Sequence, residues 1–168
     1  MPFQSSVNIQ YGFGVVGERI VDGPERVESL QLDTNGGTIG RFFTKANGTG
    51  VATQGGTITN GSIVMAGILV APKNHALQGT TAGTLVPTLA LPGFAQGGFM
   101  TMGTVIVPIA NAGNIGDIIE YNLTDGTLKA KAPGATVDPG YAYIPNCVVY
   151  RYPVTNSGGG LTAIRITN

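Results

Sequence analysis

The sequence predicts an all-β protein, folded as an antiparallel β-sandwich or barrel of jelly-roll type. Turn residues recur roughly every 8–15 residues, with short runs of Val, Ile, Thr, Tyr and Phe between them, a spacing typical of these folds. The 27 Gly and 10 Pro supply many such turns and interrupt helices. The length of 168 residues suits one domain with its own core. We therefore expect a single β domain over residues 1–168. A two-sheet sandwich is favoured and barrel closure is the alternative, because both protect strand edges.

The first part of the chain is expected to hold strands joined by Asn-Gly turns. Residues 1–9 carry no charged side chain, and Pro2 disfavours a helical start, so we expect an extended N-terminal arm. In the segment 24–32, Leu30 and Leu32 alternate, which favours a strand over a helix that would open at Pro24. Asn-Gly pairs at 35–36, 47–48 and 60–61 predict hairpin turns.

The middle of the chain is predicted to be irregular. Residues 72–99 contain Pro72, Pro87, Pro92 and several Gly, which interrupt regular structure. We expect long loops there, around one short strand at Thr84–Leu91.

The C-terminal part gives the clearest hairpins. Ile119, Tyr121 and Leu123 lie on one face before Asp125-Gly126, and Leu128 and Ala130 alternate with Lys129 and Lys131 after it. The Asp-Gly pair predicts a two-residue type I′ turn. A looser turn at residues 157–160 should join the strands 148–155 and 161–167. No internal sequence repeat is visible.

The charge content argues against several classes of function. Nine Lys and Arg balance nine Asp and Glu, and charged residues make up 11% of the chain, against about 25% in an ordinary domain. A neutral surface promotes association. The cations are dispersed, whereas nucleic-acid binding needs them clustered. The longest apolar run, Ile63–Ala71, is far short of the ~20 residues of a membrane helix. The N-terminus lacks the pattern of a signal peptide, so we expect synthesis in a cytoplasm.

The residues that could carry chemistry are few. His75 is the only imidazole, and Cys147 begins an apolar strand, so we expect a surface histidine and a small core residue. One His and one Cys cannot build a zinc site. The segment Gly12–Gly17 fits G-x-G-x-x-G, but Gly23-Pro24 interrupts any helix that would follow, as a dinucleotide site requires. We expect no enzyme, cofactor or metal, although two carboxylates that met in space could serve a glycosidase.

Several turn and strand signatures follow one another along the chain in a fixed order. They include Met1-Pro2-Phe3-Gln4, Phe13-Gly14-Val15-Val16-Gly17-Glu18, Asp22-Gly23-Pro24-Glu25-Arg26, Ala66-Gly67-Ile68-Leu69-Val70-Ala71-Pro72-Lys73 and Asn114-Ile115-Gly116-Asp117. This succession resembles the structural cement (capsid decoration) proteins of tailed bacteriophages, over almost the whole chain.

The resemblance implies a non-enzymatic virion protein with a jelly-roll-like fold. Such a subunit binds the outer surface of an assembled capsid and cements neighbouring capsomers. Its implied partners are the major capsid protein and itself, as a homodimer or homotrimer, with no nucleic acid and no membrane. The protein would be made in the bacterial host cytoplasm. The resemblance implies no catalytic residue and no cofactor.

Aromatic residues and Met are the best candidates for the interfaces of such a subunit, because interface cores are enriched in them. One set, near the N-terminus, consists of Phe3, Tyr11 and Phe13; the other, on a Gly-rich loop, consists of Phe94, Phe99 and Met100. The alternative is that the first set packs in the core and that the loop merely caps the sandwich.

A second function class is a jelly-roll binding module, such as a receptor- or carbohydrate-binding head of a phage particle. A sugar-binding head would be expected to offer aromatic platforms for stacking. The chain has no Trp and only six Tyr, which argues against this class.

Overall fold

The computed structural model describes residues 14–71 and 89–167, and this part of the chain forms strands without any helix. The prediction of an all-β fold is therefore confirmed. The strands are β1 Arg19–Ile20, β2 Arg26–Leu32, β3 Gly37–Thr38, β4 Phe42–Ala46, β5 Val51–Gln54, β6 Ile63–Val70, β7 Ala90–Leu91, β8 Gln96–Ile109, β9 Ile118–Asn122, β10 Leu128–Lys131, β11 Tyr141–Arg151 and β12 Gly160–Ile166.

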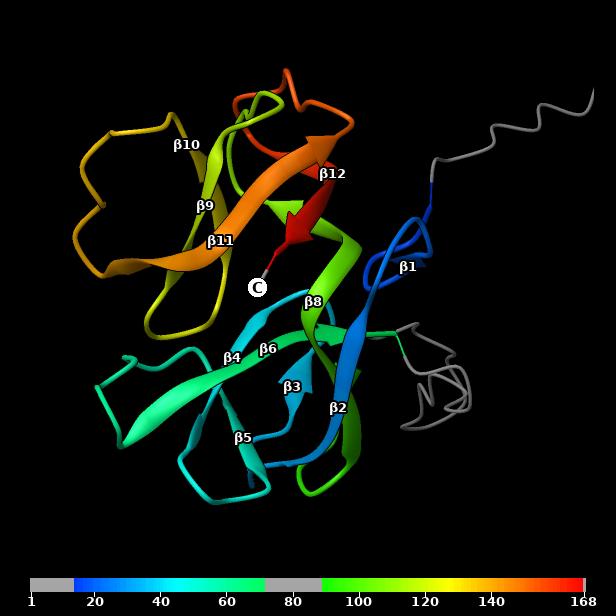
Figure 1. Cartoon of the computed structure of the whole chain (residues 1–168), viewed down its shortest axis with the longest axis vertical. Helices are drawn as coiled ribbons and strands as arrows, with labels where there is room; N and C mark the ends of the chain where they lie inside the picture. The colour runs from blue at the N-terminus through cyan, green and yellow to red at the C-terminus, as the bar shows by residue number, and fades with distance from the viewer. Residues whose placement is uncertain (1–13, 72–88, 168) are drawn as a thin grey trace, which may run out of the picture.

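One continuous sheet closes on itself twice and makes two rings that share the long strand β8 (Figure 1). The first ring runs β8–β2–β5–β4–β6 and back to β8, using residues 96–102 of that strand. The second ring runs β8–β12–β11–β9–β10 and back to β8, using residues 103–109. These closed rings match the barrel alternative, since ring closure leaves few strand edges exposed.

The two rings have the same connectivity. In chain order the first ring uses β2, β4, β5, β6 and the first half of β8, and the second uses the second half of β8, β9, β10, β11 and β12. In both rings the first strand pairs in parallel with the third, and all other pairings within the rings are antiparallel. The two rings are therefore a structural repeat, which no visible sequence repeat indicates.

The strand registers of the two rings also agree. The parallel pair Leu32 opposite Ala52 corresponds to Ile109 opposite Leu128. The antiparallel pairs of β4 with β5 correspond one by one to those of β9 with β10, 76 residues further along the chain. A strand that slipped by one residue would turn its side chains to the opposite face, so matching registers place matching side chains inside.

Each ring encloses apolar side chains at corresponding positions. The corresponding pairs, all buried, are Leu30 and Val107, Leu32 and Ile109, Phe43 and Ile119, Ala52 and Leu128, Leu69 and Val149, and Phe99 and Ile164. Phe42, Ile68, Val70 and Met100, from first-ring strands, belong to the second ring's apolar cluster. The ring of Phe42 lies 3.9 Å from that of Tyr121. The two rings are thus joined by a common apolar contact as well as by β8.

Several predicted elements are confirmed. Residues 26–32 form strand β2 and not a helix. Antiparallel hairpins join β4 to β5 through Asn47-Gly48, β9 to β10 through Asp125-Gly126, and β11 to β12 through residues 152–159. Asn60-Gly61 makes a tight turn closed by a bridge between Thr59 and Ile63, although β5 and β6 both pair with β4 and not with each other.

Three details of the local prediction were wrong. The connection at Asp125-Gly126 spans residues 123–127, because Asn122 accepts two backbone N–H groups there and only Gly126 has a positive φ. The Asn35-Gly36 turn joins no hairpin, since β2 pairs with β8 and β5. Residues 96–99 are strand and not loop. Gly97 fits this strand because a Cβ there would lie 2.7 Å from Leu69 Cδ1.

Candidate interaction surfaces

The described residues do not assemble a catalytic or metal centre. No group of three or more His, Cys, Asp or Glu side chains comes together among residues 14–71 and 89–167. Cys147 is buried, and burial raises the pKa of its thiol, which keeps the thiol protonated and unreactive. His75 lies outside the described residues. In the same ranges, no helix of membrane-spanning length and hydropathy is found.

Phe94 is the predicted interface residue that the structure places on the surface. Its side chain is 63% exposed, and its backbone has φ 63°, a left-handed conformation that is rare for a bulky residue. The conformation is fixed by two contacts: the Phe94 N–H donates to the Asp33 carbonyl, and the Gln31 side chain donates to the Phe94 carbonyl. Phe94 therefore combines an exposed aromatic ring with a left-handed backbone held by hydrogen bonds.

The remaining predicted interface residues fall into two groups. Phe99 and Met100 are completely buried, on strand β8, so the expectation of an exposed loop there is corrected. Phe99 packs edge-on against Phe43 at 5.2 Å inside the first ring. Phe3, Tyr11 and Phe13 lie outside the described residues.

A hollow of about 320 Å³ lies where the two rings meet. Its walls combine apolar side chains of Ile20, Met102 and Ile166 with the polar groups of Asp22 and Arg165. They come from the segment around β1, the middle of β8 and the end of β12. This hollow is therefore built at the junction and belongs to neither ring alone.

Beside the hollow, Asp22 is the centre of a charged network. Its carboxylate accepts hydrogen bonds from Arg165 at 2.8 Å and from the Thr104 hydroxyl at 2.9 Å, and it forms an ion pair with Arg151 at 3.2 Å. The Arg165 guanidinium also lies over the Tyr150 ring, 3.4 Å from its centroid. These contacts tie the β1–β2 connection to three strands of the second ring, and so hold the junction together.

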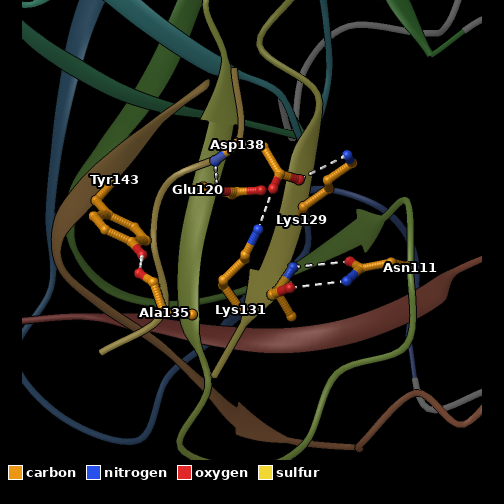
Figure 2. A network of polar contacts seen from close by, with 8 residues as sticks. Asn111, Glu120, Lys129, Lys131, Ala135, Asp138 and Tyr143 are labelled. Atoms are coloured by element: carbon orange, nitrogen blue, oxygen red, sulfur yellow. Dashed lines mark hydrogen bonds and ion pairs between the residues drawn. The ribbon is translucent and has the colours of Figure 1, made fainter. Parts of the chain in front are cut away.

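A second polar network lies on the outside of the second ring (Figure 2). Asp138 is paired with both Lys129 and Lys131, and these hydrogen bonds lower the pKa of its carboxyl. Glu120 lies next to Asp138 and is completely buried, and one of its carboxylate oxygens accepts the Asp138 N–H at 3.2 Å. The other oxygen has no partner among the described residues. Burial raises the pKa of Glu120, and the nearby negative charge of Asp138 adds to that effect.

The same view shows how the second ring is closed. The side-chain amide of Asn111 donates to the Ala130 carbonyl at 2.8 Å and accepts the Ala130 N–H at 2.9 Å (Figure 2). This side chain thereby takes the place of a neighbouring strand along β10, whose backbone pairing with β8 is a single residue pair.

Most surface charge is neutralised within the molecule. Within residues 14–71 and 89–167, six ion pairs involve Arg19, Lys45, Lys129, Lys131, Arg151 and Arg165. The side chains paired in this way are less available to a charged ligand than free ones would be.

The internal repeat was missed from the sequence, although a short trace of it is present. Asn35-Gly36-Gly37-Thr38-Ile39-Gly40 and Asn111-Ala112-Gly113-Asn114-Ile115-Gly116 share Asn, Gly, Ile and Gly at the same spacing. Gly37 and Gly113 are both closely packed: an added Cβ would lie 2.4 Å from Phe43 and 2.6 Å from Ala130. In a chain with 27 Gly, so short a match carries little weight until the registers are known.

Comparisons with known proteins agree with this architecture. The family model described as structural cement protein (E217 gp24/Pam3 gp6) matches residues 3–167. A chain of the solved structure "The capsid of Myoviridae Phage XM1" has the same fold, with a TM-score of 0.66 and 19% sequence identity, over 100% of this chain and 99% of that one. A search of curated proteins gave no match.

Proposed function

This chain belongs to the structural cement protein family of phages, and from that premise we propose that it binds the outer surface of an assembled phage capsid and ties neighbouring capsomers together. Its partners in this role are the major capsid protein and further copies of itself, as a homodimer or homotrimer. The protein is made in the bacterial host cytoplasm and works on the capsid exterior, and it catalyses no reaction.

The observation that carries the proposal is the exposed, strained Phe94 on a surface whose charges are mostly paired internally. Interface cores are depleted in charge, and their binding energy is concentrated in a few anchors that are often aromatic. A particle also presents many sites side by side, so each subunit needs only modest contacts to bridge its neighbours. Phe94 has the residue type and the exposure expected of such an anchor residue.

The test is co-sedimentation of the purified protein with pre-assembled shells. Phe94→Asn removes the aromatic ring while keeping a residue that tolerates a positive φ, so the isolated protein should keep its thermal stability. Shell affinity should fall by about tenfold or more, the loss expected for an anchor residue. Val51→Thr, at an exposed position of β5, is the matched control and should bind like the wild type.

Salt separates apolar from ionic attachment in the same assay. Binding should persist between about 0.1 and 1 M salt, although the Debye length falls from ~10 to ~3 Å over that range. Release of most of the bound protein would contradict the apolar interface. Failure to bind shells, together with binding to host cells or glycans, would favour the alternative of a receptor- or carbohydrate-binding head.

We also propose that residues 1–9 act as an arm that adds to a neighbouring molecule. The segment carries no charged side chain, and an extended peptide can gain affinity from backbone hydrogen bonds alone. Deleting residues 1–6 should leave a folded domain with weaker self-association or weaker shell binding. Thermal unfolding and co-sedimentation of the same sample check this. Loss of folding would make the segment part of the core, and wild-type binding would make it dispensable.

A further inference from the structure

We propose that the hollow of about 320 Å³ at the junction of the two rings is the docking site for Tyr11 of the same chain. Tyr11 belongs to the N-terminal segment that precedes the described residues. Its docking on its own molecule is distinct from the proposed role of residues 1–9, which add to a neighbour. Four features of the structure carry the proposal: where the described chain begins, the spacing along β8, the charges at the hollow and the chemistry of its walls.

The described chain begins at one end of this hollow. Gly14 lies against Ile106 of β8, since a Cβ added at Gly14 would lie 2.1 Å from Ile106 Cδ1. Side chains alternate along a strand, so Ile106 and Thr104 share a face, and Thr104 is part of the wall of the hollow. Strand β1 runs alongside, with Ile20 opposite Thr104 and the Glu18 carbonyl accepting the Ile106 N–H at 2.9 Å. The N-terminal segment therefore joins the molecule beside the hollow and on the same face of β8.

The spacing along β8 selects position 11. Two residues of a strand span about 7 Å, so the wall of the hollow at residues 102–104 lies about 7–13 Å along the strand from Ile106. Tyr11 precedes Gly14 by three residues, which span about 10 Å when extended. A segment that continues along β8 from Gly14 therefore brings Tyr11 to this wall. Phe13 is the direct neighbour of Gly14 and falls short of it.

The charges at the hollow are already paired, which favours an uncharged occupant. Among the described residues that line it, the charged side chains are Asp22, Glu25 and Arg165. Arg165 donates to Asp22 at 2.8 Å, and Arg19 pairs with Glu25 at 2.9 Å. A further buried charge would find no partner there and would be costly. Residues 1–13 carry no charged side chain and meet this condition.

The walls suit an aromatic ring in particular. Their apolar part consists of Ile20, Met102 and Ile166. A methionine sulfur makes favourable contacts with aromatic rings, and a guanidinium group is attracted to the face of a ring. Arg165 already makes such a contact in this region, because it lies over the Tyr150 ring, 3.4 Å from its centroid. A tyrosine can bury its ring and leave its hydroxyl at a polar rim, so Tyr11 matches both the apolar and the polar parts of the wall.

The segment is also tethered next to its site. A covalent link makes docking an intramolecular event, for which modest contacts suffice. Docked in this way, Tyr11 fixes the point at which residues 1–9 leave the molecule. That consequence rests on the proposed arm, whereas the docking itself does not.

Methyl NMR of the full-length protein tests whether Tyr11 occupies the hollow. The methionines of the chain are Met1, Met65, Met100 and Met102. Labelling with ¹³C-methyl methionine therefore gives few signals, and Met102→Leu identifies the one at the hollow. We expect nuclear Overhauser contacts between an aromatic ring and the Met102 methyl group. Tyr11→Leu should remove these contacts and shift the Met102 signal, while unchanged Met65 and Met100 signals show that the fold is intact.

Two further substitutions serve as controls. Phe3→Leu removes a ring from the same N-terminal segment and should leave the Met102 signal and its contacts unchanged. Phe13→Leu tests the spacing along β8, and the contacts to Met102 should survive it. Contacts that disappear with Phe13→Leu and persist with Tyr11→Leu would make Phe13 the occupant and overturn the proposal.

A mixed sample separates docking on the same molecule from docking on a neighbour. Half of the copies carry ¹³C-methyl methionine and deuterated tyrosine, and the other half carry unlabelled methionine and ordinary tyrosine. Contacts from a tyrosine ring to the labelled Met102 then arise only between two copies, and we expect none. Their presence would place the segment of a second copy in the hollow and overturn the proposal.

An empty hollow gives a third result. A Met102 signal without aromatic contacts, and without a shift in Tyr11→Leu, rejects the docking of Tyr11. No capsid shell takes part in these measurements, so such a result leaves the proposed function to its own co-sedimentation test.

Discussion

At Glu120 the two rings carry side chains of different chemistry. The matching residue of the first ring is Thr44, whose hydroxyl donates to the Gly55 carbonyl at 2.7 Å and is fully satisfied. Glu120 instead holds a buried carboxyl group with one oxygen unpartnered among the described residues. An unpaired buried acceptor is costly when ionised, and the cost falls when the group takes up a proton.

This cost should be visible as a dependence of stability on pH. The pKa of Glu120 is raised above its usual 4.5 in the folded protein by burial, so the folded state binds the proton more tightly than the unfolded state. Its contribution to stability is present below pH 4.5 and is lost as the pH rises through the raised pKa. The pKa of the facing Asp138 is lowered below 3.8, and the pKa values of Lys129 and Lys131 are raised above 10.5. These three groups therefore titrate outside the pH range in which Glu120 does.

We therefore expect the free energy of unfolding to decrease as the pH is raised above about 4.5, and Glu120→Gln to remove that decrease. Urea denaturation at a series of pH values measures both proteins. The substitution keeps an acceptor for the Asp138 N–H, so the fold should be preserved. An equal slope in the two proteins would show that another group causes the pH dependence.

At the scale of single elements, the second ring depends on one side chain for its closure. Asn111 makes both hydrogen bonds that a strand would have made to Ala130. Asn111→Ala leaves a donor and an acceptor of β10 without their partner, which should cost about 1–3 kcal/mol. Hydrogen exchange should speed up at the Ala130 amide. The Asp33 amide, which closes the first ring by donating to Ala52, is the control and should be unaffected.

How far the elements could be predicted depends on how local their causes are. The hairpin at β9–β10 was predictable, because Asp125-Gly126 and the alternation of Leu128 with Lys129 are both local signals. The first part of strand β8 was predicted as loop, because glycine is uncommon in strands and residues 97 and 98 are both glycine. Only the close contacts of these glycines with other strands explain why glycine is needed there. Ring closure through parallel pairs joins distant segments, which no short pattern encodes.

The same distinction applies to the candidate interface. Phe94 and Phe99 lie five residues apart in one Gly-rich segment, and composition cannot tell them apart. One sits on a turn and is exposed, whereas the other points into the first ring. Residue type therefore selects candidate interface residues in this segment, and strand register decides which of them are exposed.

At the scale of the whole molecule, the shared strand should make folding a single event. Residues 96–102 complete the first ring and residues 103–109 the second, so neither ring is closed if β8 is not in place. Loosening the first ring should therefore destabilise the second. Ile39→Val tests this in the first ring, and its expected cost is about 0.5–1.5 kcal/mol.

The probe for the second ring is built into the chain. The described tyrosines, Tyr121, Tyr141, Tyr143, Tyr150 and Tyr152, all lie in or next to second-ring strands, and the chain has no Trp. Thermal unfolding followed by tyrosine fluorescence and by far-ultraviolet dichroism should shift together in the Ile39→Val variant, by about 2–4 °C per kcal/mol. A shift in the dichroism alone would mean that the rings unfold separately.

The shared strand also determines where foreign sequence can be added to this molecule. One residue inserted in β8 would invert the side chains of everything that follows it in the strand, and so spoil one ring whichever half it entered. The β4–β5 turn has the opposite character, because Cβ atoms added at Gly48 and Gly50 would meet nothing within 4 Å. If the protein is to carry a peptide epitope or an enzyme as cargo, residues 48–49 are the site for the graft, because Asn47 and Gly50 on either side hold backbone hydrogen bonds to Ser62 and Gln31.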